Sequence, residues 1–119
     1  MRVHHYSIEV RDLNQSSDFY ENILGFKEES RMHLNGERVL FLTLGAARLE
    51  LVQPESPAEA SPPSSRMHLA FEVVDLNPLL DRMLHAGCEI VEGPIRLDMG
   101  WSCVFLTGPD GEMLEFIQI

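Results

Sequence analysis

Hydrophobic and polar residues along the first half of the chain follow spacings that predict one helix among four strands. Asn14 is the expected N-cap of the helix, and Gly25 is its expected stop signal. Asn35 and Gly36 together predict a two-residue turn between the second and third strands. The predicted elements are strands over residues 3–10, 31–34, 37–44 and 48–53, with a helix over residues 15–24.

The second half predicts the same order of elements. Asn77 and Pro78 are expected as the N-cap and the first residue of a helix that ends near Gly87. Residues 94–100 fit either a loop or a short strand. The predicted strands cover residues 67–73, 88–91, 102–106 and 113–119, and the apolar helix face consists of Leu79, Leu80, Met83 and Leu84. Each half therefore indicates a βαβββ module of an α+β fold.

The sequence itself repeats between the two halves. Residues 5–14 match residues 68–77, with His, Glu, Val, Asp, Leu and Asn recurring in register. Residues 49–53 and 114–118 also match, because each segment reads Leu-Glu, two apolar residues and Gln. Two such agreements in the same order indicate a duplicated module.

The segment between the modules, residues 54–65, is dominated by Pro and Ser, which predicts a surface linker. Each module has about 50 residues, which is marginal for an independent hydrophobic core. We therefore expect a single domain over residues 1–119, in which modules 1–53 and 66–119 share one core.

Composition narrows the possible functions. The chain has 119 residues, of which 19 are acidic and 9 basic, and its net charge is −10. This charge repels phosphate backbones, so nucleic-acid binding is not expected. No apolar run approaches the ~20 residues that cross a bilayer, and the first residues lack the apolar core of a secretion signal. We expect a cytoplasmic protein without a membrane partner, in which Cys88 and Cys103 are small apolar residues.

Four polar side chains occupy corresponding strand positions in the two halves: His5 and Glu50 in the first, His68 and Glu115 in the second. Strand side chains alternate, so these four are expected to face away from the apolar sides that pack on the helices. A mid-strand carboxylate is costly to bury without a partner. Two imidazoles and two carboxylates in one cleft would bind a divalent ion, and such nitrogen and oxygen donors suit zinc, nickel, cobalt, manganese or iron.

The alternative interpretation is that these four residues are solvated on two open sheet faces. Each residue alone favours that alternative, whereas the recurrence of all four favours the metal site. His4 is expected to point to the opposite face, as a surface or packing residue. Glu9 and Glu72 also recur, but they lie further along their strands and are expected at the rim. Trp101 fits either a pocket wall or a packing residue.

These residues and their surroundings resemble the vicinal oxygen chelate superfamily, which includes glyoxalase I, bleomycin resistance proteins and extradiol dioxygenases. The resemblance covers nearly the whole chain. It implies that the two modules form a cupped, incomplete β-barrel around a metal ion, with the helices outside. The matching motifs are His5 with its strand, Asp12-Leu13, Phe19-Tyr20, Leu24-Gly25-Phe26, Leu49-Glu50-Leu51, His68, and Gly108-Pro109-Asp110-Gly111 before Leu114-Glu115-Phe116.

Within this superfamily, the order of the four residues is most similar to glyoxalase I. That similarity implies one divalent ion per site, with zinc, nickel or cobalt expected first and manganese or iron as alternatives. The implied substrate is a hemithioacetal of methylglyoxal with a low-molecular-weight thiol, on which the ion acts as a Lewis acid. Glu115 is the implied base that moves a proton between neighbouring carbons, and Glu50 is a ligand and second base. The implied metal ligands are His5, Glu50, His68 and Glu115.

Two other functions stay open within the superfamily. A metal-free, bleomycin-type resistance protein would bind a cationic drug, which the acidic composition suits. A manganese-dependent fosfomycin thiol transferase would need no carboxylate at position 50. An anionic thiol adduct would need positive charge near the site, for which Arg11, Arg38 and Arg96 are the candidates. Similarity to paired relatives implies a homodimer, with each site inside one chain or shared by two.

Overall fold

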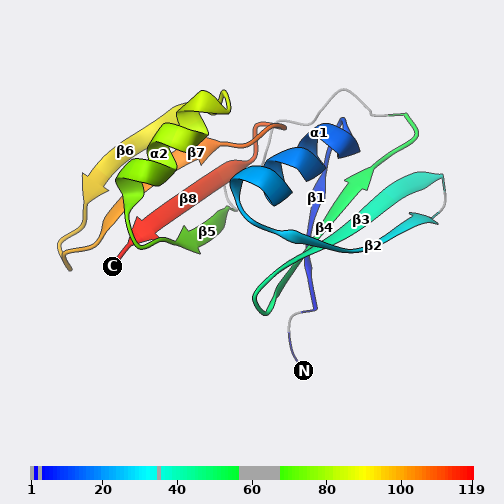
Figure 1. Ribbon diagram of the computed structural model, residues 1–119, viewed down its shortest axis with the longest axis horizontal. Coiled ribbons are helices and arrows are strands. Elements are labelled where there is room, and N and C mark those ends of the chain that lie inside the picture. The colour runs from blue at the N-terminus through cyan, green and yellow to red at the C-terminus, as the bar shows by residue number, and fades with distance from the viewer. Residues whose placement is uncertain (1, 3, 35, 57–67) are drawn as a thin grey trace. The chain divides into compact units, whose positions relative to one another are not determined.

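The computed structural model describes residue 2 and residues 4–34, 36–56 and 68–119. The chain divides into two compact units, Met1–Ser61 and Pro62–Ile119. Each unit contains a four-stranded sheet built in the order strand, helical segment and three strands (Figure 1). The predicted α+β class with two βαβββ modules is confirmed. No helix within the described ranges has the length and apolar character needed to cross a membrane.

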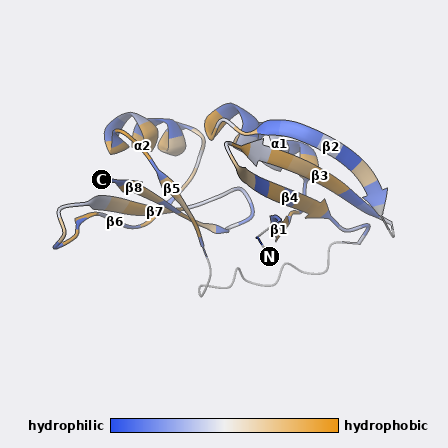
Figure 2. Cartoon of the chain, turned by 90° about the horizontal axis from the view of Figure 1, so that it is seen from below, coloured by the Kyte–Doolittle hydropathy of each residue, from blue (hydrophilic) through white to orange (hydrophobic). Residues whose placement is uncertain are grey.

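The first unit has the sheet order β1-β4-β3-β2, in which β1 runs parallel to β4 and the other neighbours are antiparallel. The edge strand β2 is mostly hydrophilic and its neighbour β3 is mostly hydrophobic (Figure 2). Charges on an edge strand discourage pairing with other chains. The elements are β1 (Tyr6–Glu9), α1 (Leu13–Asp18), the π-helical turn η1 (Phe19–Ile23), β2 (Lys27–Leu34), β3 (Glu37–Leu44) and β4 (Ala47–Gln53).

The second unit repeats this topology with the sheet order β5-β8-β7-β6, and β5 is parallel to β8. Its helix α2 contacts β7 and β8. The elements are β5 (Leu69–Glu72), α2 (Leu76–His85), β6 (Ile90–Arg96), β7 (Ser102–Thr107) and β8 (Met113–Gln118).

Each unit buries a set of apolar side chains on the face of its sheet that carries the helix. Alternation along the central strands produces this face, because Leu49 and Leu51 in β4 and Leu114 and Phe116 in β8 are all buried. The residues between them point to the other face of the sheet. That the two modules share one core in a single domain stays a prediction. Further buried residues are Leu13, Tyr20, Leu40 and Leu42 in the first unit, and Leu76, Leu79, Met83, Val104 and Leu106 in the second.

Aspartates cap both helices, so the predicted asparagine caps are wrong. The Asp12 carboxylate accepts a hydrogen bond of 3.0 Å from the backbone N–H of Gln15, and the Asp75 carboxylate accepts one of 3.0 Å from the backbone N–H of Asn77. Both aspartates have extended backbone angles, as an N-cap requires. Pro78 therefore lies third in α2 rather than first. It is tolerated there because the first helical turn leaves its N–H groups without intrahelical partners.

The glutamine that closes each module also holds the start of the helix. The side-chain oxygen of Gln53 accepts the N–H of Leu13 at 2.7 Å, and that of Gln118 accepts the N–H of Leu76 at 2.9 Å. These two bonds tie the end of the central strand to the first helical residue in both units. The repeated Gln thus has a structural role.

Replacing Gln118 with alanine should lower the free energy of unfolding by about 1 kcal/mol, since the N–H of Leu76 loses its acceptor. Asn77→Ala is the matched control, because the Asn77 side chain is exposed and only its backbone N–H bonds to the cap. Urea denaturation of both variants measures the difference. Equal stability of Gln118→Ala and the parent protein would contradict this role.

Other element boundaries differ from the predictions for local reasons. The predicted helix over residues 15–24 is an α-helix continued by one π-helical turn, and it ends at Gly25 with φ of 82°. β2 begins earlier than predicted, because a register shift between Glu28 and Ser30 interrupts the alternation. β6 extends to Arg96 through two further register shifts, which explains the mixed signal there. Most of the predicted linker, residues 57–65, lies outside the described residues.

Candidate metal-binding site

His5 and Glu50 are brought together by two neighbouring parallel strands. His5 directly precedes β1, and Ser7 of β1 pairs in register with Glu50 of β4. The His5 Nε2 atom lies 3.5 Å from Glu50 Oε2. The Glu50 side chain is only 19% exposed, because its strand neighbours and the imidazole cover it. The repeated pattern predicted only that these two side chains share one face of the sheet.

His68 and Glu115 form the equivalent pair in the second unit. His68 precedes β5, and Ala70 of β5 pairs in register with Glu115 of β8. The distance from His68 Nε2 to Glu115 Oε2 is 2.8 Å, and the Glu115 side chain is 13% exposed. Both carboxylates are therefore shielded on the sheet face opposite the helix, and each has an imidazole beside it.

Each pair includes a phenylalanine that the sequence analysis missed. Phe41 pairs across the strands with Glu50, and Phe105 pairs with Glu115. The Phe41 ring lies edge-on to His5 with ring centroids 5.5 Å apart, and Phe105 lies edge-on to His68 at 5.6 Å. The signal was present, because Phe-Leu-Thr occurs in both modules, at 41–43 and 105–107.

The phenylalanines have two physical effects on the pairs. An aromatic edge against each imidazole restricts the rotation of that ring. Their apolar surface also reduces water around the carboxylates, which strengthens any electrostatic interaction there. We refer to His5 and Glu50 as the first pair and to His68 and Glu115 as the second pair. Phe41 lies beside the first pair and Phe105 beside the second.

The donor atoms fit a divalent metal ion. Two ligands about 2.1 Å from one ion lie roughly 3.0 to 3.4 Å apart at octahedral or tetrahedral angles. The separation of 3.5 Å in the first pair is just above that range, and the 2.8 Å contact of the second pair is a hydrogen bond that a metal ion would replace. Across the residues that the structure describes, no group of three or more His, Cys, Asp or Glu side chains gathers to hold a metal. The four predicted ligands thus occur as two pairs, one in each unit.

Comparison with known proteins identifies the family. The family model described as "Glyoxalase/Bleomycin resistance protein/Dioxygenase superfamily" matches residues 2–116. The chain belongs to this superfamily. The match includes both His–Glu pairs.

Individual members of the superfamily match over almost the whole chain. An uncharacterized protein of Bacillus subtilis, YwbC, is 32% identical, covering 98% of this chain and 97% of its own. A lactoylglutathione lyase of Neisseria meningitidis is 29% identical, covering 99% and 91%. The solved structure of a glyoxalase family protein from Enterococcus faecalis is 28% identical with a TM-score of 0.79, covering 98% and 97%. The chain therefore shares the family and the fold of these proteins.

In this superfamily member, His4 contacts the first pair and does not point away from it as expected. Its Nδ1 atom lies 2.8 Å from His5 Nδ1, and its Nε2 atom lies 3.0 Å from Nη1 of Arg48. The guanidinium of Arg48 in turn donates two bonds of 2.7 Å to Glu29. Because a guanidinium only donates, Nε2 of His4 must accept, which places the His4 proton on Nδ1, facing His5. His4 therefore donates to His5 Nδ1, which leaves the proton of a neutral His5 on Nε2, toward Glu50; a metal bound at Nε2 would have to displace that proton.

Two of the candidate arginines, Arg38 and Arg96, lie on the sheet face opposite the pair of their own unit. Arg38 pairs in register with Gln53, an odd number of residues from Glu50, so it belongs to the opposite sheet face. Arg96 pairs with Ser102 and faces away from Phe105 for the same reason. Arg11 is exposed after β1. Arg48 shares the face of Glu50, and its bonds to Glu29 hold the pKa of that carboxyl below its ordinary value.

The remaining candidates contribute no ligand to either pair. Glu9 and Glu72 are exposed, as expected for rim residues. Trp101 is half-buried in the loop between β6 and β7, where its carbonyl accepts the N–H of Leu97 at 2.7 Å. Cys103 is buried near Glu115, and burial, followed by the charge of Glu115, raises the pKa of its thiol.

Proposed function

We propose that the chain is a metal-dependent lyase or isomerase of the glyoxalase I type, whose substrate is a hemithioacetal of methylglyoxal with a low-molecular-weight thiol. The observation that carries this proposal is the repeated pair of an imidazole and a shielded carboxylate, found at the same place in both units. A drug-binding cavity or a thiol transferase has no need for a carboxylate in both pairs. Membership of the superfamily and the relative named lactoylglutathione lyase support the proposal.

Four side chains would hold the metal: His5 and Glu50 from one unit, and His68 and Glu115 from the other. Zinc, nickel or cobalt suits this nitrogen and oxygen set, as do manganese and iron. When bound, the ion supplies a Lewis acid for the two neighbouring oxygens of the substrate. The chain's own residues supply the proton transfers and the environment for them.

Glu115 is the proposed general base. Its carboxylate takes the proton from the carbon that carries the thiol sulfur, and the electron pair moves toward the neighbouring carbonyl to give an enediolate. Glu115 then returns the proton to that neighbouring carbon, and the hydroxyl proton of the sulfur-bearing carbon passes to the neighbouring oxygen, which yields a lactoyl thioester with the same atoms as the substrate. No oxidant or reductant is consumed. Glu50 occupies the corresponding position in the other unit and is the proposed second base.

Phe41 and Phe105 support this chemistry by excluding water from the carboxylates. Shielded carboxylates are held in place for proton transfer without reorganising solvent. We also propose that the chain forms a homodimer, with each site inside one chain or shared by two. Size-exclusion chromatography with mass detection checks this, and a monomer at all working concentrations would contradict it.

An activity assay tests the proposed reaction. Protein stripped with a chelator and then loaded with zinc, nickel, cobalt or manganese is mixed with methylglyoxal and glutathione or another small thiol. We expect thioester absorbance to appear with at least one loaded ion and to be absent from the stripped protein, which is the control. Two other outcomes would contradict the proposal: thiol addition to fosfomycin with manganese in place of thioester formation, or tight binding of a cationic glycopeptide by stripped protein that is inactive with every ion.

A further inference from the structure

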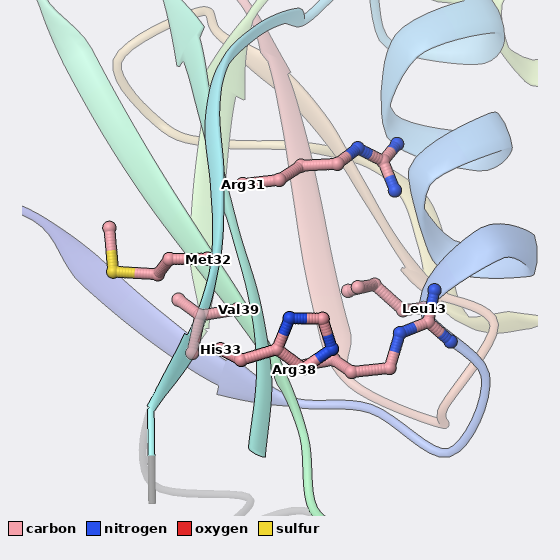
Figure 3. A pocket seen from close by; sticks show the side chains of 6 residues that line it. All are labelled: Leu13, Arg31, Met32, His33, Arg38 and Val39. Carbon is pink, nitrogen blue, oxygen red and sulfur yellow. The ribbon is translucent and has the colours of Figure 1, made fainter. Parts of the chain in front are cut away.

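A small pocket in the first unit lies at the edge of the sheet beside the start of α1 (Figure 3). Its volume is about 130 Å³. Half of the side chains that line it are basic, although the chain as a whole carries a net charge of −10. The lining residues are Leu13, Arg31, Met32, His33, Arg38 and Val39.

Strand register gathers the basic side chains in this pocket. His33 of β2 pairs directly with Arg38 of β3, and Arg31 lies two positions before His33, on the same face of β2. Figure 3 shows the side chains of Arg31, His33 and Arg38 extending toward the helix, and Met32 pointing the other way. Leu13, the first residue of α1, borders the pocket on the helix side.

Arg31 has a carboxylate partner, whereas Arg38 has none among the described residues. Arg31 donates bonds of 2.8 and 3.0 Å to both oxygens of Glu28, so its charge is matched. For Arg38 the described residues provide no ion pair, and no carboxylate lines the pocket. An unmatched guanidinium beside an imidazole and a second guanidinium is a favourable position for an anion.

The pocket is separate from the His–Glu pair of its own unit. Arg38 lies on the sheet face that carries α1, whereas His5 and Glu50 lie on the other face. Its volume is enough for a group the size of phosphate. The bound group would therefore be neither the proposed substrate nor a ligand of the proposed metal.

We infer that this pocket binds a small doubly charged oxyanion, either inorganic phosphate or the phosphate of a monoester. The planar fork of Arg38 matches two phosphate oxygens, and an imidazole N–H of His33 and the N–H groups of Arg31 that do not bond to Glu28 reach further oxygens. Leu13 provides apolar surface on the helix side of the pocket, which reduces competition from water. The inference is independent of the proposed metal-dependent reaction.

A titration with inorganic phosphate tests the inference. Backbone amide signals of the full-length protein are followed by two-dimensional NMR at constant ionic strength, with chloride as the compensating anion. We expect saturable shifts concentrated in β2 and β3. Arg38→Gln should weaken phosphate binding by about tenfold or more, because a charge-assisted bidentate contact is lost. Arg96→Gln removes the same charge in the other unit and should change the affinity less than about twofold.

A second variant and a second phosphate compound complete the test of the inference. Arg38→Lys, which keeps the charge but loses the fork, should bind with intermediate affinity and serves if Arg38→Gln does not fold. Glycerol phosphate binding at the same amides with higher affinity than inorganic phosphate would assign the site to monoesters, and the reverse order would assign it to the free ion. The inference would be overturned if the amide shifts did not saturate with phosphate, or if chloride caused equal shifts. It would also be overturned if succinate bound as tightly as phosphate, or if Arg38→Gln bound phosphate with the parent affinity.

Discussion

Replacing Glu115 with glutamine should lower kcat for the hemithioacetal by about a thousandfold, within the 10²- to 10⁴-fold contribution of a general base. Glutamine has the shape of glutamate and can still bond to His68, but its amide cannot take a proton from carbon. The change should leave KM within a few fold, since the substrate contacts persist. Steady-state kinetics with the metal-loaded protein measures both constants.

Glu72→Gln is the matched control for Glu115→Gln. It makes the same carboxylate-to-amide change in the same unit, at an exposed position on β5. We expect Glu72→Gln to keep the parent kcat, and both variants to keep the parent melting temperature. A Glu115→Gln enzyme with full kcat would contradict the role of this carboxylate as base, whatever its role in binding metal.

Phe116→Ala should produce the largest loss of stability in the second unit, about 3–5 kcal/mol in the free energy of unfolding. Phe116 is 1% exposed, and its ring stacks on Phe71 with centroids 5.4 Å apart. Removing it deletes the apolar contact and leaves a cavity between β8 and the rest of the core. The single tryptophan, Trp101, lies in this unit, so its fluorescence during urea denaturation reports the loss directly.

A conservative variant and an exposed control accompany Phe116→Ala. Phe116→Leu keeps most of the volume and should cost about 1 kcal/mol, which serves if Phe116→Ala does not fold. Val74→Ala truncates a side chain that is 97% exposed and should change stability by less than about 0.5 kcal/mol. If Phe116→Ala cost no more than Val74→Ala, the assignment of Phe116 to the core of this unit would be wrong.

The order of elements and the two His–Glu pairs could be predicted because both follow from periodicity. A residue between two buried leucines, such as Glu50 between Leu49 and Leu51, must point to the opposite face, and its neighbour on a parallel strand must share that face. The repetition of the pattern then selected the same positions in the second module. Alternation assigned the faces and repetition selected the residues, whereas the pairing of neighbouring strands that puts each histidine beside its glutamate came from the structure.

Other features depend on contacts between segments that no local pattern reveals. Asp12 rather than Asn14 caps α1, because the Gln53 side chain from β4 fixes the helix start at Leu13. The contact of His4 with His5 depends on Arg48, whose position is set by the bonds to Glu29. Register shifts in β2 and β6 broke the alternation on which the strand limits were based. These tertiary contacts overrode the local preferences.

The central claim is that one divalent ion is bound jointly by the two His–Glu pairs, and a count of bound cobalt ions tests it most directly. Equilibrium dialysis of the stripped protein gives the number of ions per chain for the parent, His5→Ala and His68→Ala, with His85→Ala at the end of α2 as control. The account predicts one ion per chain for the parent and for His85→Ala, and loss of that ion from each of the other two variants. Two ions per chain in the parent, or one ion retained at parent affinity by both His5→Ala and His68→Ala, would contradict it.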